Sequence, residues 1–127
     1  MPEKILYEYA ILRLVPKVER EEFINVGVII FSKKEDYLKV KYFINDNRIN
    51  AFCHELDLDF IDSNLNALSK IAEGIHPESA VSNFETPERF RWLTAVRSSS
   101  IQSSRPHPGK TTNLDKTLDR LFKEHVL

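Results

Sequence analysis

The sequence is poor in cysteine and glycine, and both shortages exclude classes of function. Cys53 is the only cysteine among 127 residues, so no internal disulfide can form and a reducing, cytoplasmic setting is expected. The three glycines are widely separated, which excludes a glycine-rich phosphate-binding loop. The four histidines lack the i, i+4 spacing of helical metal ligands. We therefore expect neither a metal site nor a cofactor.

Long apolar runs and a strong net charge are also missing. The longest apolar run, Val26–Phe31, is far too short to span a bilayer, and the N-terminus does not have the pattern of a signal peptide. A net charge of −1 means that a nucleic-acid-binding protein would need a local basic patch. The chain does have 42% hydrophobic residues, which is enough for the core of one domain over residues 1–127.

The first third of the chain has the pattern of β-strands. Leu6–Val15 alternates with apolar residues on both faces, which is typical of a central strand, and Pro16 ends it. Phe23–Phe31 is rich in β-branched residues, and Gly27 inside it indicates a bulge or a close backbone approach. Tyr37–Ile44 alternates apolar and charged residues, as an antiparallel strand with one solvated face does. We predict a three-stranded antiparallel meander.

The middle of the chain predicts helices. A short helix over Arg48–His54 precedes a longer amphipathic helix, which Asp57 or Asp59 caps and Gly74 ends. A further helix over Pro87–Leu93 is predicted because a threonine at the N-cap and a proline at the first helical position are typical of helix starts.

The end of the chain predicts a strand, a loop and a last helix. The strand runs from Val96 to about Ser103, and the loop is Pro106-His107-Pro108-Gly109. The last helix, Leu114–His125, follows a Thr112-x-x-Asp115 pattern that resembles a capping box. These elements predict the α+β class, with an antiparallel β-sheet (a three-stranded meander plus a later strand) and helices packed on one face.

Positive charge gathers between Thr86 and Lys110. Five basic residues stand there against one acidic residue, which leaves a local charge of +4: Arg89, Arg91, Arg97, Arg105 and Lys110 against Glu88. Arginine and serine side chains suit phosphate oxygens, and Trp92 could stack on a base, so this stretch suits an anion or nucleotide site. Alternatively, its aromatic residues belong to the core and its arginines pair with carboxylates or face solvent.

A serine-based reaction would have to use the run Ser98-Ser99-Ser100 with His107, the only local candidates for a nucleophile and a base. The chain has no Gly-x-Ser-x-Gly elbow. Because a strand rich in serine is more often polar surface, the sequence assigns no catalytic residue.

Polar residues in the predicted strands form a second group of candidates. Arg13, in an otherwise apolar strand, either snorkels at the sheet margin or meets an anion. Asn25 needs hydrogen-bond partners among its apolar neighbours, as does Glu22 if it turns inward. Either Glu22 pairs with Arg13 or an arginine of the basic stretch, or Arg13, Glu22 and Asn25 line one pocket with Arg97 and Gln102. The sequence leaves both arrangements open.

Three blocks in order carry a resemblance to a known family: residues 9–16 (YAILRLVP), residues 22–31 (EFINVGVIIF), and residues 89–98 (RFRWLTAVRS) running into Ile101-Gln102 and His107-Pro108-Gly109. They resemble the bacterial family of unknown function numbered 3037 over nearly the whole chain. The matching polar residues are Arg13, Glu22, Asn25, Arg89, Arg91, Arg97 and Gln102. The resemblance implies a small cytoplasmic domain without an assigned activity, whose gene often stands beside genes for kinases resembling HipA, a toxin-type serine kinase.

We therefore expect a non-enzymatic accessory protein that binds a protein partner, with a HipA-like kinase as the candidate. Its contact patch would include Trp92 and Arg97, because tryptophan and arginine are favoured interface anchors. The alternative is a nucleotide- or nucleic-acid-binding domain, or a hydrolase, in which Arg13, Arg91 and Arg97 converge on one cleft near Glu22. The oligomeric state stays open. The candidate binding residues are Arg13, Glu22, Asn25, Arg89, Arg91, Trp92, Arg97, Gln102 and His107.

Overall fold

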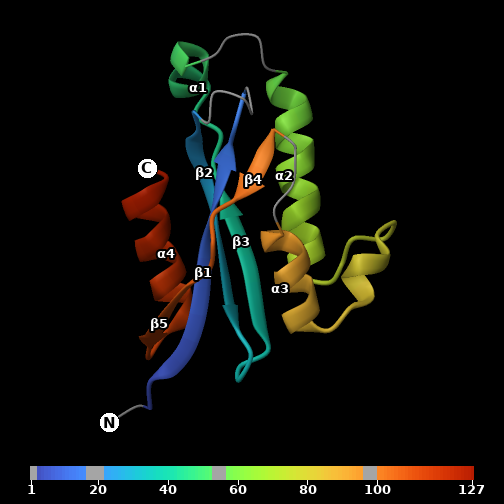
Figure 1. Cartoon of the computed structure of the whole chain (residues 1–127), viewed down its shortest axis with the longest axis vertical. Coiled ribbons are helices and arrows are strands. Elements are labelled where there is room, and N and C mark those ends of the chain that lie inside the picture. The colour runs from blue at the N-terminus through green and yellow to red at the C-terminus, as the bar shows by residue number, and fades with distance from the viewer. Residues whose placement is uncertain (1–2, 17–21, 53–56, 96–99) are drawn as a thin grey trace.

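A five-stranded antiparallel sheet forms the centre of the molecule (Figure 1). The computed structural model describes residues 3–16, 22–52, 57–95 and 100–127. The strands β1 (Ile5–Leu14), β2 (Ile24–Ser32) and β3 (Tyr37–Tyr42) lie in the order β3-β2-β1, which confirms the antiparallel meander. Two later strands, β4 (Ile101–Ser103) and β5 (His107–Thr111), pair with successive parts of the other edge of β1.

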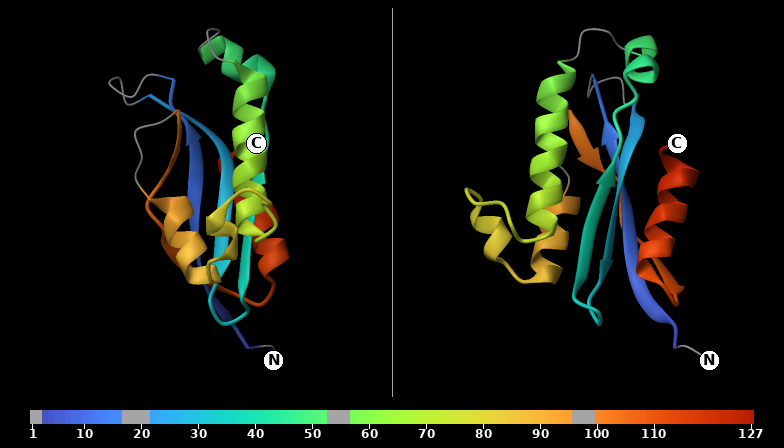
Figure 2. Two further views of the ribbon diagram at one scale, coloured as in Figure 1. Left: turned by 90° about the vertical axis from the view of Figure 1, so that its right-hand side faces the viewer. Right: turned by 180° about the vertical axis from the view of Figure 1, so that it is seen from behind.

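Helices cover both faces of this sheet (Figure 2). The helices α2 (Leu58–Ala72) and α3 (Thr86–Thr94) lie on one face, and α4 (Leu114–His125) lies on the other. The short helix α1 (Asp46–Phe52) and the 3-10 turn η2 (Ala80–Asn83) flank α2 in the chain. No helix in the described ranges is both long and apolar enough to cross a membrane.

The α+β class is confirmed, whereas the prediction that all helices pack on one face is wrong for α4. The reason lies in the central strands, because β1 and β2 carry apolar side chains on both faces. Leaving either face bare would expose a continuous apolar surface to water.

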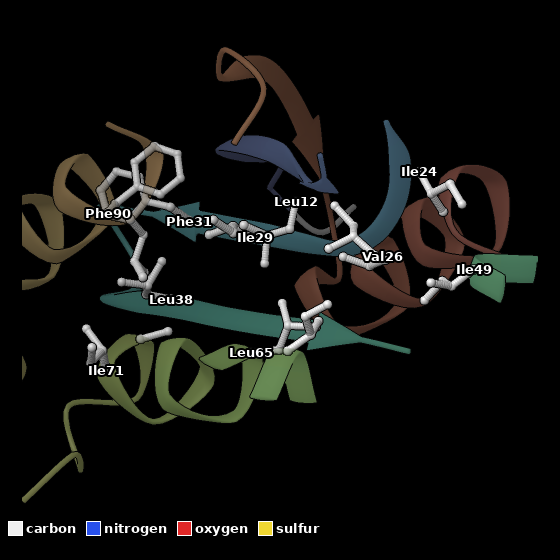
Figure 3. Packing of buried hydrophobic residues seen from close by; sticks show 14 residues of the cluster. Leu12, Ile24, Val26, Ile29, Phe31, Leu38, Ile49, Leu65, Ile71 and Phe90 are labelled. Atoms are coloured by element: carbon white, nitrogen blue, oxygen red, sulfur yellow. The ribbon is translucent and has the colours of Figure 1, made fainter. Parts of the chain in front are cut away.

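Two hydrophobic cores result from this layering. The larger core lies between the sheet and the helices α2 and α3, where Phe31 stacks on Phe90 with 4.7 Å between the ring centroids (Figure 3). The smaller core lies under α4 and joins strand residues such as Tyr7 and Val28 to Leu118 of the helix. A central strand that serves two cores is fixed in register, since a shift by one residue would exchange its two faces.

Polar contacts also join α4 to the edge strand β3. The Tyr37 hydroxyl donates a hydrogen bond of 2.5 Å to the Asp115 carboxylate, which also accepts from Lys39 at 3.2 Å. Lys41 forms a salt bridge of 2.7 Å with Asp119. The alternation of β3 predicted a charged face with Lys39 and Lys41. Helix α4 runs along this face.

The helix boundaries follow the sequence signals in most places. Asp57 caps α2 by accepting from the Phe60 amide, and Gly74 follows this helix with a φ of 72°. The capping box predicted for the last helix is wrong. The N-cap of α4 is Asn113, whose side chain accepts from the Lys116 amide at 3.0 Å, because an asparagine directly before the helix reaches the first turn without help from Thr112.

The loop predicted at residues 106–109 is also wrong, because His107 and its successors form β5. A proline is tolerated in an edge strand, where one side of the ladder needs no donor. Gly109 lies against the ring of Tyr7, and a Cβ atom on Gly109 would come within 2.5 Å of that ring. The small residue therefore lets β5 pair closely with β1. Of the strand predicted from Val96, residues 96–99 lie outside the described residues.

Candidate functional site

Three of the predicted binding residues lie side by side across the sheet. Arg13 on β1 is paired with Asn25 on β2 and with Gln102 on β4. The register of β1 against β2 shifts just before Arg13, where Gly27 lies opposite Leu12, and a Cβ atom on Gly27 would lie 3.0 Å from the Lys41 carbonyl oxygen, so the prediction of a bulge or a close backbone approach at Gly27 is confirmed. Because bulges re-aim the side chains beside them, this one helps to set the direction of the row.

The chemistry of this row is partly structural. The Asn25 side chain donates a hydrogen bond of 3.1 Å to the His125 carbonyl, and so satisfies one of the free carbonyls at the end of α4. The Arg13 guanidinium lies 4.2 Å from the ring centroid of Phe23 and takes part in none of the salt bridges between described residues. An ion pair between Arg13 and Glu22, one of the arrangements that the sequence leaves open, is not among these salt bridges, although Glu22 does have a polar or ionic contact of its own.

Arg89 on α3 joins three segments of the chain. Its guanidinium donates to the Phe84 carbonyl at 2.6 Å, to the Ala72 carbonyl at 3.4 Å and to the Thr86 hydroxyl at 3.3 Å. These acceptors belong to the end of α2, the segment after η2 and the start of α3. Arg89 therefore acts as a brace within the fold.

The other candidates on α3 lie on the same side of the sheet as Arg89. Trp92 is half-buried against the larger core, and Arg91 is exposed. Arg13 lies between two residues of β1 that point into that core, so its side chain points to the opposite face. The described arginines therefore occupy both faces of the sheet. Arg97 lies outside the described residues, as do Ser98 and Ser99.

His107 lies in an aromatic group beside α4. Its ring centroid is 5.4 Å from that of Tyr9, its partner in the ladder between β1 and β5, and Tyr9 is 6.0 Å from His125. Among the residues that the structure describes, no three His, Cys, Asp or Glu side chains are placed to hold a metal ion. Cys53 and His54 lie outside them.

An open groove of about 690 Å³ lies at the N-terminal end of β1. It faces the same side as α2 and α3, but the start of β1 extends past these helices (Figure 1). On the opposite face Tyr7 is buried under α4, so the sheet is bare here on one side only. The groove is lined by Leu6, Tyr7, Glu8, Phe31, Lys33, Lys34 and Pro108.

The register explains how this groove is built. Glu8 lies between Phe31 on β2 and Pro108 on β5, and Leu6 lies opposite Lys110 on β5. Directly paired residues share a face, so apolar and charged side chains alternate over the bare surface. We call this surface, made of the lining residues and Lys110, the β1–β5 groove. Its size falls within the range of ligand and peptide pockets.

A family model described as protein of unknown function (DUF3037) matches residues 9–126. The chain belongs to this family. No curated protein and no solved structure matches the chain. In this DUF3037 chain, Leu6, Tyr7 and Glu8 precede the matched range, whereas the remaining residues of the β1–β5 groove lie inside it.

The β1–β5 groove of this DUF3037 chain is not evident in the sequence. Most residues of β1 are apolar on both faces, which predicts a strand covered on both sides. The signal that points to the groove is Glu8, a carboxylate in the row that otherwise consists of Leu6, Ala10, Leu12 and Leu14. A charge in such a row indicates that the cover ends before that point.

Proposed function

We propose that this DUF3037 protein is a non-enzymatic binding protein that holds a protein partner in the β1–β5 groove. The observation that carries the proposal is the exposed apolar floor of the groove. Leu6 is 60% exposed, although every other residue of β1 is buried or half-buried. A concave apolar surface with a charged rim is typical of sites that bind another molecule.

The groove is held by rigid elements. Its floor consists of β1, β2 and β5, and the Tyr7 ring packed on Gly109 keeps β1 and β5 in close contact. A surface built on paired strands loses little conformational entropy when a partner binds. This arrangement supports the groove over a patch around Trp92, because Trp92 is half-buried against the core.

The nucleotide or nucleic-acid alternative has less support in the described residues. The Arg89 guanidinium donates hydrogen bonds to main-chain and hydroxyl oxygens within the fold, so these donors are not directed at a bound phosphate. Arg13 and the arginines of α3 lie on opposite faces of the sheet. Retained nucleotide is nevertheless one outcome that the test below distinguishes.

The test compares the wild type with Leu6→Asp and with Ile75→Asp, a matched control because Ile75 is also 60% exposed and lies outside the groove. Each tagged protein is used to recover partners from native lysate, and a recovered protein is then purified and titrated by calorimetry. The family resemblance makes a HipA-like kinase the first candidate to titrate.

We expect stoichiometric binding by the wild type and Ile75→Asp, and a loss of at least about tenfold in affinity for Leu6→Asp, since the floor loses its exposed apolar side chain and gains a carboxylate that the bound partner would desolvate. Equal binding by all three proteins would contradict the proposed site. Retained nucleotide without a protein partner would favour the alternative function.

A further inference from the structure

The β1–β5 groove has a charge pattern that restricts the partner it can accept. Three lysines and one glutamate border the apolar floor, which leaves a local charge of +2: Lys33, Lys34 and Lys110 against Glu8. The whole chain has a net charge of −1, so the groove carries local positive charge on a molecule that is slightly negative overall.

The lysine charges are available to a partner. Lys33 and Lys110 take part in none of the salt bridges between described residues. Lys34 forms one with Glu3 at 3.4 Å, with side chains that are 59% and 83% exposed. Exposed pairs of this kind are weak and exchange readily for another carboxylate.

We infer that the groove binds a short segment of the partner protein that carries a large apolar side chain next to acidic side chains. This inference rests on the proposed function. The apolar side chain would cover Leu6, and the acidic ones would meet the lysines on either side of it. Glu8, which lies between Phe31 and Pro108, would accept hydrogen bonds from main-chain amides of the bound segment. Such amide donors are present in every peptide.

The shape of the surface favours a peptide over a membrane or a nucleic acid. A bilayer is bound by apolar side chains that protrude, whereas this floor is concave and has one exposed large hydrophobic side chain, Leu6. Stacking on bases needs exposed aromatic rings. The two aromatic residues among the lining residues, Tyr7 and Phe31, are only 5% and 8% exposed, and the Tyr7 ring packs on the other face of the sheet.

A selection from a library of random displayed peptides tests this inference. The library is selected separately on the wild type, on Leu6→Asp, and on a charge-reversed variant with Lys33→Glu, Lys34→Glu and Lys110→Glu. Urea unfolding first establishes that each variant is folded. A labelled peptide from the wild-type selection is then titrated by fluorescence anisotropy at low and high salt.

We expect the wild type to enrich peptides with apolar and acidic residues. Charge reversal should lower the affinity for the labelled peptide by about tenfold or more, and the selection on this variant should enrich basic peptides instead. High salt should weaken binding to the wild type, because exposed charge pairs are screened.

The other outcomes are distinct. Enriched peptides that depend on Leu6 but carry no acidic residues would overturn the inference and leave the docking site intact. Peptides that bind Leu6→Asp equally well would overturn the docking site itself, as would a failure to enrich any peptide. Binding to phosphatidylglycerol vesicles that is lost in Leu6→Asp, without peptide binding, would replace the partner with a membrane.

Discussion

At the scale of single residues, Arg89 shows why an arginine-rich stretch is ambiguous in a sequence. It stands in the basic segment together with Arg91, and both match the polar pattern of the family. The two differ only in surroundings, because Arg89 donates to two carbonyls and one hydroxyl on three segments, whereas Arg91 faces solvent. A linear sequence does not contain the distance from Arg89 to the end of α2.

This difference can be measured by substituting each arginine with alanine. We expect Arg89→Ala to lower the free energy of unfolding by about 2–3 kcal/mol, because two main-chain carbonyls lose a charged donor. The matched control Arg91→Ala should stay within about 0.5 kcal/mol of the wild type. Urea denaturation measures both. A stable Arg89→Ala variant that had lost partner binding would show that Arg89 serves a site and not the fold.

At the scale of elements, the start of α4 differs from the sequence prediction, because Asn113 and not Thr112 is the N-cap. Asn113→Ala should lower the free energy of unfolding by about 1 kcal/mol, since the helix loses its side-chain cap. Thr112→Ala should have little effect, although the sequence pattern assigned the cap to that residue. Chemical denaturation of the two variants decides between them, and a larger loss for Thr112→Ala would contradict the structure.

The link between α4 and β3 should make stability depend on pH. The hydrogen bond from Tyr37, followed by the interaction with Lys39, lowers the pKa of Asp115 below its ordinary value of 3.8. A lowered carboxyl pKa adds stability that is present above the unfolded-state pKa and is lost as the pH falls through the folded-state pKa. The Tyr37 phenol stays protonated, because burial and the Asp115 carboxylate raise its pKa.

We therefore expect the wild type to be more stable than Asp115→Asn near neutral pH. The difference should shrink as the pH falls from about 4 through the lowered folded-state pKa of Asp115, below which the carboxylate is protonated in both states. Urea unfolding over a series of pH values measures it, with Glu78→Gln as a control for an exposed carboxylate. A difference that grows on acidification would show that the sign is wrong.

At the scale of the whole molecule, periodic patterns predicted elements better than they predicted surfaces. The meander and the last helix followed from alternation and helical spacing, because these periods come from backbone geometry. The second helical layer did not follow, since apolar residues on both faces of β1 do not tell which helix covers which face. The neighbours of Arg13 on β2 and β4 and of His107 on β1 come from long-range pairing, which the order of residues alone does not contain.

The β1–β5 groove depends on the same long-range pairing. It exists because β5 extends the sheet beside the start of β1, while α2 and α3 end before reaching it. A segment that was predicted to be a loop thus supplies one wall of the groove through Pro108.

The central claim is that a protein partner contacts the bare face at the start of β1. The most direct measurement places a photo-crosslinking amino acid at position 6 in the full chain and, separately, at position 75, and irradiates native cells. We expect one discrete crosslinked protein from position 6 and none from position 75. The same product from both positions, or no product from position 6 while another surface of the protein crosslinks, would contradict it.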